Sequence, residues 1–212
     1  MKTLFIKAKQ NLDIIPVLKQ VKIQGKVGLV STIQLEHHLE KAQKWIKDSV
    51  IGGQILGCNA SKALQINEKV DSFLYIGSGK FHPIWVALTT KKPVYIANPY
   101  TNKFYKLPEE EITNYENKKK ANLKKFYNAT KIGILISTKQ GQFHPQQYLE
   151  LKEKLKIVDK LKNKFKDKEC YTFICDNIDE KELENFPDIE AWVNTACPRI
   201  EYKNIINMAH IL

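Results

Sequence analysis

Short apolar runs alternate with longer amphipathic stretches along this chain. Segments rich in β-branched and aromatic residues predict strands over 27–31, 54–56, 72–76, 93–97, 131–137, 171–175 and 191–195. Apolar residues at helical spacing predict helices over 35–46, 83–90, 108–127, 151–165 and 179–186, the last of them capped by Asp179. Strands that alternate with helices indicate an α/β fold in which helices cover both faces of a parallel sheet.

The pattern starts again near residue 131. The segments KVGLVST (26–32) and KIGILIST (131–138) are similar, which favours an internal duplication, although any two buried strands share such composition. We therefore expect an α/β fold of two similar units, each a small parallel sheet flanked by helices. The expected boundaries give a leading segment over 1–20, one unit over 21–130 and another over 131–212.

Composition limits the classes of protein that fit. The chain is 43% hydrophobic, as is usual for a protein with a buried core, and no apolar run approaches the roughly 20 residues that cross a bilayer. The segment 1–10 lacks the apolar centre of a signal peptide, so we expect a cytoplasmic protein with no membrane partner. The net charge of +11 fits an acidic partner such as RNA or, alternatively, lysine-rich solvated helix faces. Because the lysines are scattered and no basic, aromatic stripe stands out, we expect no direct nucleic acid binding.

Arginine and cysteine are more informative than the net charge. Arg199 is the only arginine among 34 basic residues, and its planar guanidinium suits a carboxylate ligand or a structural ion pair. The four cysteines, at 58, 170, 175 and 197, form no CxxC pair of the zinc-ribbon kind. In a cytoplasmic chain we expect them to be buried, reactive or metal-binding rather than paired in disulfides. Cys175 lies inside a predicted strand, where we expect a core thiol.

Ligands of open α/β sheets bind beyond the carboxyl ends of the strands, and both Cys58 and Cys197 follow predicted strands. Either could be an iron–sulfur ligand or a buried inert thiol. Cys197 precedes Pro198, and a Cys-Pro step closes many iron–sulfur sites.

Other strand ends carry polar residues with two interpretations each. Gly77-Ser78-Gly79 suits an anion cradle before a helix or a simple tight turn. His82 suits a catalytic group or a hydrogen-bonding residue at a helix start, and 139–142 suits a ligand loop or a turn. The sequence contains no Walker loop, HExxH, GxGxxG or CxxxCxxC motif, and we find no Ser/His/Asp arrangement.

Several blocks of sequence resemble one known family. These are GGQILGC (52–58), FLYIGSGKFHPIWVAL (73–88), NPYT (98–101), ISTKQGQ (136–142) and WVNTACPRI (192–200). They are similar, in the same order, to blocks of the archaeal-type diphthamide synthases, the 2-(3-amino-3-carboxypropyl)histidine synthases.

The resemblance implies a fold and a metal cluster. Family members have three similar α/β domains around a pseudo-threefold axis, and each domain gives one cysteine to a [4Fe–4S] cluster. This chain resembles the second and third domains, with 1–20 similar to the end of the first, so Cys58 and Cys197 are the implied metal ligands and catalytic cysteines. The implied arrangement is a split enzyme: a separate polypeptide carries the missing first domain and third cysteine. A truncated chain or a degenerate subunit is the alternative.

The resemblance also implies the chemistry. The reduced cluster gives an electron to S-adenosylmethionine (SAM), and the resulting 3-amino-3-carboxypropyl radical adds to a histidine of translation elongation factor 2. This radical transfer is the first step of diphthamide biosynthesis. A dimer or heterotetramer is implied, since family members dimerise. At the strand ends we expect SAM to contact Gln54, Gly77, Ser78, Gly79, His82, Ser137, Lys139, Gly141, Gln142 and Arg199, with Lys139 or Arg199 on its carboxylate.

Two other hypotheses remain at this stage. One is a non-catalytic structural or electron-relay subunit of the same complex, and the other is a basic RNA-binding α/β protein. The enzyme hypothesis depends on geometry, because it requires the thiols of Cys58 and Cys197 to face a shared iron site.

Overall fold

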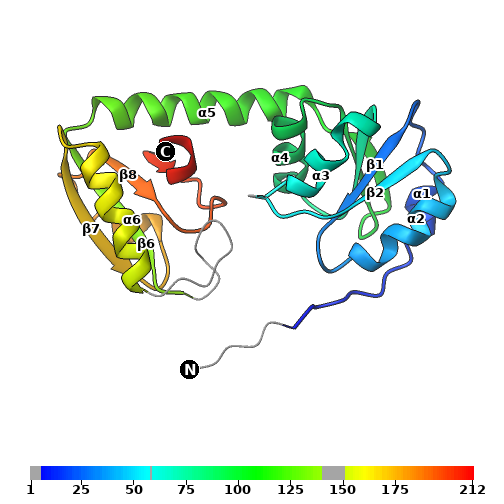
Figure 1. The fold of residues 1–212 in the computed structure, drawn as a ribbon, viewed down its shortest axis with the longest axis horizontal. Coiled ribbons are helices and arrows are strands. Elements are labelled where there is room, and N and C mark those ends of the chain that lie inside the picture. Colours follow the sequence, from blue (N-terminus) through cyan, green and yellow to red (C-terminus); the bar gives the residue numbers. More distant parts are fainter. Residues whose placement is uncertain (1–5, 58, 140–150) are drawn as a thin grey trace. The chain divides into compact units, whose positions relative to one another are not determined.

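The computed structural model describes residues 6–57, 59–139 and 151–212. The chain forms two compact units, Met1–Ile112 and Thr113–Leu212, each with its own sheet (Figure 1). The long helix α5 (Glu109–Asn128) begins at the end of the first unit and lies mostly in the second. That these units are the second and third family domains stays a prediction.

The first unit is built on a five-stranded sheet. Its strands are β1 (Val27–Ser31), β2 (Ser49–Gln54), β3 (Ser72–Ile76), β4 (Val94–Asn98) and β5 (Lys103–Lys106), and its helices are α1 (Ile15–Leu18), α2 (Leu39–Trp45), α3 (Ser61–Gln65) and α4 (Phe81–Thr90). The strand order is β2-β1-β3-β4-β5, parallel except for β5, which pairs antiparallel to β4.

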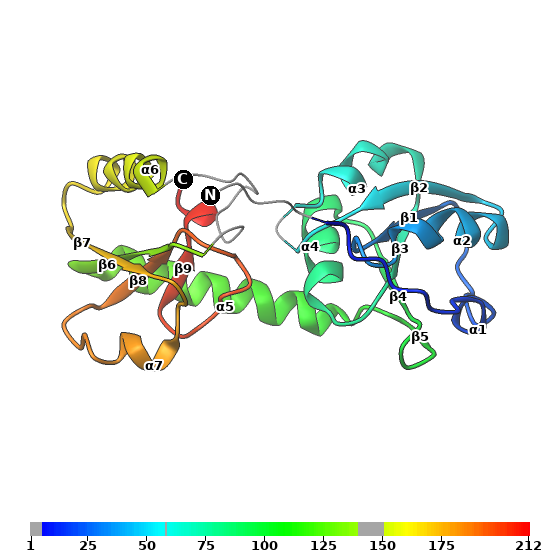
Figure 2. The ribbon, with the colours of Figure 1, turned by 90° about the horizontal axis from the view of Figure 1, so that it is seen from below.

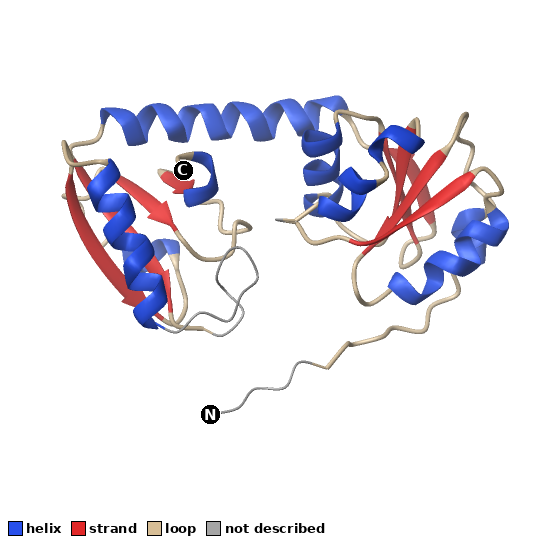
Figure 3. Ribbon diagram, in the orientation of Figure 1, coloured by secondary structure: helices blue, strands red, loops and turns tan. Residues whose placement is uncertain are grey.

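The second unit has a four-stranded sheet that is wholly parallel. Its strands are β6 (Lys131–Ser137), β7 (Glu169–Cys175), β8 (Ala191–Asn194) and β9 (Ile205–Asn207), in the order β7-β6-β8-β9. Besides α5, its helices are α6 (Leu151–Lys164) and α7 (Glu180–Leu183), which begins at the predicted cap: Asp179 Oδ1 accepts from the Lys181 backbone N–H at 3.0 Å. Figures 2 and 3 show helices on both faces of the sheets, as the α/β prediction requires.

The two units share a strand topology. In each, the first strand is central, the second lies on one side, and the third and fourth follow on the other. A glycine of the central strand pairs with an aromatic residue of the third strand in both units: Gly28 with Phe73, and Gly133 with Trp192. These glycines come from the two similar segments, so the shared register supports the duplication.

Alternate residues of β6 build two separate cores. Ile134 packs with Phe126 of α5 and Val158 of α6 on one face. Leu135 packs with Trp192 on the other, against the side covered by α7. This alternation is what a strand buried on both faces requires.

The sequence prediction was wrong at several elements. The strand expected over 54–56 is β2, Ser49–Gln54, and its two glycines and half-buried edge position hide its strand pattern. The edge strands β5 and β9 and the short helices α1 and α3 were not predicted. β5 is a four-residue edge strand, KFYK, with an exposed lysine at each end, and the others have three to five residues, too few to show a period.

The glycine–aromatic pairs generate a stability prediction. A Cβ on Gly133 would lie 2.3 Å from Trp192 Cε3, and one on Gly28 would lie 2.7 Å from Phe73 Cδ1. We expect Gly133→Ala to lower the free energy of unfolding by about 1–3 kcal/mol, because the ring must shift in a packed core. Urea denaturation measures this, with Asn117→Ala on exposed α5 surface as the control, expected within about 0.5 kcal/mol of the parent. An unchanged Gly133→Ala midpoint would contradict the close packing.

Candidate functional site

Cys197 lies on the loop that leaves the carboxyl end of β8. Just after the strand, the Thr195 hydroxyl donates to the Leu135 carbonyl of β6 at 2.7 Å. Cys197 is half-buried, Pro198 is buried and Arg199 is exposed. The thiol therefore sits at the carboxyl edge of the sheet, on a loop whose start is fixed to the central strand.

Two buried amides contact this loop from within the unit. Asn194 Oδ1 accepts from the Ala196 N–H at 2.8 Å, and its Nδ2 donates to the Cys197 carbonyl at 2.9 Å. The same Nδ2 donates to Asn207 Oδ1 at 2.7 Å, and Asn207 Nδ2 donates to the Pro198 carbonyl at 3.0 Å. Neither asparagine was predicted as a site residue. Asn194 stands in a predicted strand three residues before a candidate ligand, whereas Asn207 ends β9, which has no sequence signal.

Ser137 and Lys139 lie at the end of the neighbouring strand β6. The buried Ser137 hydroxyl donates to the Asp176 carbonyl at 2.8 Å and accepts from the Lys139 backbone N–H at 3.2 Å. The Lys154 ammonium, also buried, donates to the Ser137 carbonyl at 2.6 Å, and burial lowers its pKa. Lys139 itself is exposed and donates to Asn177 Oδ1 at 3.3 Å. Since β6 and β8 are paired, the structure brings this corner next to the start of the Cys197 loop.

In the first unit, the Gly77-Ser78-Gly79 turn joins β3 to α4. The buried Tyr75 hydroxyl donates to the Ser78 carbonyl at 3.2 Å, and burial raises the pKa of Tyr75. A Cβ on Gly77 would lie 2.5 Å from that hydroxyl, while Gly79 has a φ of +76°. Both glycines are thus required by the turn itself, and the anion-cradle role stays a prediction.

His82 lies in the first turn of α4, beside the same turn. Its ring stacks on Tyr75 with centroids 5.9 Å apart and planes inclined by 11°. Gln54 is half-buried at the end of β2, on the far side of β1 from β3. The first unit therefore brings 77–79 and His82 together but keeps Gln54 two strands away.

Three predicted site residues lie outside the described residues: Cys58, Gly141 and Gln142. The neighbours of Cys58 are described. Gly57 packs so closely on Phe81 of α4 that a Cβ would lie 1.8 Å from the ring, and Leu56 and Asn59 exchange two backbone hydrogen bonds of 3.0 Å. The shared iron site for Cys58 and Cys197 stays a prediction.

Cys170 and Cys175 both lie on the edge strand β7. The core position expected for Cys175 was wrong, because the strand has a neighbour on one side only and the thiol is half-buried. Burial raises the pKa of both thiols, which disfavours the thiolate that binds metals. Cys170 lies inside the strand, and Cys175 ends it at the carboxyl edge, where its raised pKa disfavours ligation.

Comparisons with known proteins now bear on this geometry. The family model described as "Putative diphthamide synthesis protein" matches residues 1–207. This chain belongs to that diphthamide synthesis family. The 2-(3-amino-3-carboxypropyl)histidine synthase of Pyrococcus horikoshii is 32% identical over 93% of this chain and 59% of its own length, and that of Methanocaldococcus jannaschii is 31% identical over 82% and 45%. The chain thus spans about half the length of the curated relatives it matches.

A solved structure supports the same relationship. The crystal structure of Dph2 from Pyrococcus horikoshii with a 4Fe–4S cluster matches 96% of this chain and 62% of its own, with a TM-score of 0.77 and 28% identity. The predicted α/β class with two helix-flanked parallel units is therefore confirmed. No helix of the described residues combines the length and apolar character needed to cross a membrane.

An iron–sulfur cluster in this diphthamide synthesis family member would need several thiolate ligands. Within residues 6–57, 59–139 and 151–212, no three His, Cys, Asp or Glu side chains are grouped to hold a metal ion. Cys197 fits one ligand position, since it is partly accessible and the carbonyls of Cys197 and Pro198 already accept from buried amides. The described part of the chain thus offers one suitable thiol, and a complete donor set needs others.

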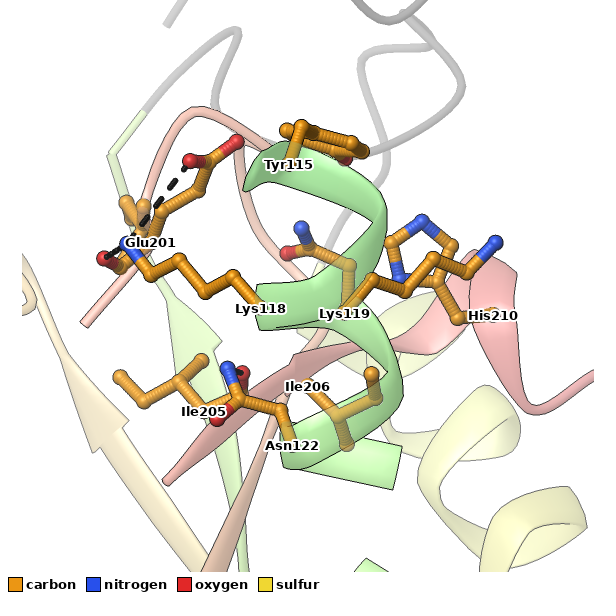
Figure 4. Close-up of a pocket in the computed structure, with 10 residues that line it drawn as sticks. Tyr115, Lys118, Lys119, Asn122, Glu201, Ile205, Ile206 and His210 are labelled. Atoms are coloured by element: carbon orange, nitrogen blue, oxygen red, sulfur yellow. Dashed lines mark hydrogen bonds and ion pairs between the residues drawn. The ribbon is translucent and has the colours of Figure 1, made fainter. Parts of the chain in front are cut away.

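A pocket of the second unit lies between α5 and the chain beyond the Cys197 loop (Figure 4). Lys118 Nζ donates to the Glu201 carbonyl at 2.7 Å, and burial raises the pKa of the Glu201 carboxyl. His210 closes another side, and burial, with Lys119 nearby, lowers its pKa to about 4. No local pattern predicts this pocket, because α5 and the C-terminal segment that line it are far apart in the sequence.

His210 generates a prediction on pH. Its pKa is about 4 in the folded state against an ordinary 6.5, so the unfolded chain binds the extra proton between these values. Protonation of His210 therefore favours the unfolded chain. The free energy of unfolding has its full value above pH 6.5 and decreases as the pH falls towards 4. We expect a loss of about 1–2 kcal/mol, less than the full shift would give because the ring is partly exposed.

Urea unfolding between pH 7 and pH 4.5 measures this loss. His210→Gln should flatten that part of the profile, whereas His38→Gln, in the first unit, should leave the unfolding of the second unit unchanged. Equal slopes in His210→Gln and the parent would refute the assignment.

Proposed function

We propose that this chain is part of a 2-(3-amino-3-carboxypropyl)histidine synthase that uses SAM to modify a histidine of translation elongation factor 2, the first step of diphthamide biosynthesis. Family membership supports the reaction class. The observation that carries the proposal for these residues is the Cys197-Pro198 loop, a half-buried thiol held at the carboxyl edge of a parallel sheet.

In this proposal Cys58 and Cys197 are two ligands of a [4Fe–4S] cluster. A third sulfur ligand comes from a separate polypeptide that carries the family's first domain. The placement of Cys170 and Cys175 supports a third ligand from elsewhere, because both lie on the edge strand β7 and burial raises the pKa of both thiols. When bound, a reduced cluster supplies the electron that cleaves the bond between the SAM sulfur and its γ-carbon.

The SAM site lies along the same strand ends. Arg199 and Lys139, both exposed, are the candidates to bind the SAM carboxylate, and a guanidinium does so with two parallel hydrogen bonds. The Gly77–Gly79 turn with His82, and the residues Gln54, Ser137, Gly141 and Gln142, complete the proposed contacts. We place the assembly, a dimer or heterotetramer, in the cytoplasm with elongation factor 2 as its protein substrate.

The test is anaerobic co-expression with a polypeptide carrying the first domain, followed by iron counting and absorbance near 400 nm. We expect about four irons per copy of this chain in the parent and less than about half of that in Cys58→Ser or Cys197→Ser, because a lost thiolate leaves the cluster poorly held. Cys175→Ser is the matched control and should keep the iron and the transfer activity.

Two outcomes would revise the proposal. If both Cys58→Ser and Cys197→Ser retain iron and activity, the chain is a structural or electron-relay subunit. If the purified chain alone binds a stable cluster and turns over, no separate polypeptide is required.

Arg199 supplies a second prediction. Arg199→Gln should weaken SAM binding to the assembled complex by about 10–100-fold, the effect of losing a charge-assisted hydrogen bond to a carboxylate. Isothermal titration measures this, with Lys166→Gln, an exposed residue beyond α6, as the matched charge control. Unchanged affinity in Arg199→Gln would assign the carboxylate to Lys139, whose Gln variant should then show the loss.

A further inference from the structure

We propose that Asn194 and Asn207 act together as positioning residues for Cys197, fixing the backbone that presents its thiol to the metal cluster. The two form an amide clamp, by which we mean their side chains and the four hydrogen bonds they make with each other and with 196–198. The role of the clamp in presenting a cluster ligand rests on the proposed function, whereas the restraint of the loop does not.

The orientation of both amides is fixed by backbone groups. The Ala196 N–H can only donate, so the Asn194 atom that faces it at 2.8 Å is the oxygen. The Pro198 carbonyl can only accept, so the Asn207 atom that faces it at 3.0 Å is the nitrogen. Between them, Asn194 Nδ2 has one hydrogen for the Cys197 carbonyl and one for Asn207 Oδ1, and both are used.

The clamp holds the loop at three consecutive residues. It contacts the carbonyl of Cys197 itself, the N–H of the residue before it, Ala196, and the carbonyl of the residue after it, Pro198. The Cys197 carbonyl also accepts from the Ile200 N–H at 3.0 Å, which closes the turn. These bonds on both sides of Cys197 restrict its backbone and therefore the directions that its Cα–Cβ bond can take.

Both amides are buried, so they bond to the loop and to each other rather than to solvent. Asn194 is 1% exposed and Asn207 is 7% exposed, at the ends of the paired strands β8 and β9. Buried amides contribute little net stability compared with apolar side chains of similar size, and they are costly when a partner is missing. Their gain is a single loop conformation, the pre-organisation that a cluster ligand requires.

The test combines two measurements on Asn194→Ala and Asn207→Ala. In the metal-free chain, we measure alkylation of Cys197 by iodoacetamide with mass spectrometry. It should become about three- to tenfold faster in Asn207→Ala, which removes one buried hydrogen bond to the loop, and faster still in Asn194→Ala, which removes two. The rates of Cys170 and Cys175 on β7 should stay unchanged. In the anaerobic complex, cluster loss to a chelator, followed near 400 nm, should accelerate by a similar factor.

The variants should differ in a way that only the clamp explains. Asn194→Ala removes three of the four hydrogen bonds and should have the larger effect, whereas Asn207→Ala leaves the bonds to Ala196 and Cys197 in place. Because both residues act through one network, the double variant should show less than the product of the single effects. Ile134→Val, a destabilising core change outside the amide network, should alter neither rate.

The outcomes separate this inference from the proposed function. If the parent complex binds no cluster, the proposed function fails, while the alkylation rates still test the clamp. If both asparagine variants match the parent in alkylation, or if Ile134→Val changes Cys197 as much as they do, the clamp has no positioning role. If Asn194→Ala does not fold, Asn207→Ala decides alone.

Discussion

Parallel pairing of the strands is the constraint on which the rest of this structure depends. Parallel strands end at the same edge, so residues far apart in the sequence meet there without any attraction between their side chains. In the second unit, β6 ends at Ser137, β8 ends at Asn194 and β9 ends at Asn207. The candidate ligand Cys197 lies three residues beyond one of these ends.

The carboxyl edge is specified by hydrogen bonds, whereas the middle of each sheet is specified by apolar packing. The strand centres carry apolar residues such as Ile134 and Leu135, and such positions accept other apolar side chains of similar volume. At the edge, Ser137, Asn194 and Asn207 are all buried and all bonded to backbone groups. Hydrogen bonds depend on direction, so they fix a loop more sharply than apolar contacts can.

The two units use one topology in different ways at this edge. In the first, β3 is followed by the Gly77–Gly79 turn and the helix α4. In the second, the equivalent strand β8 is followed by the Cys197 loop, which leads directly to β9. Even the matching serines differ, because the Ser31 hydroxyl donates to Ile76 on the third strand, whereas the Ser137 hydroxyl donates beyond the second strand. A duplicated framework thus carries two different strand-end chemistries.

The sequence by itself determined the α/β class, the two-unit pattern and most strands, since the long buried strands β1, β3 and β6 carry strong apolar signals. It also indicated that Cys197 follows a strand. It failed at β2, β5 and β9, which lie at sheet edges and are short, polar or rich in glycine. Only the tertiary structure decided that Cys175 is half-buried and that Asn194 and Asn207 meet, because strand order and register are set by contacts between distant segments, which no local pattern records.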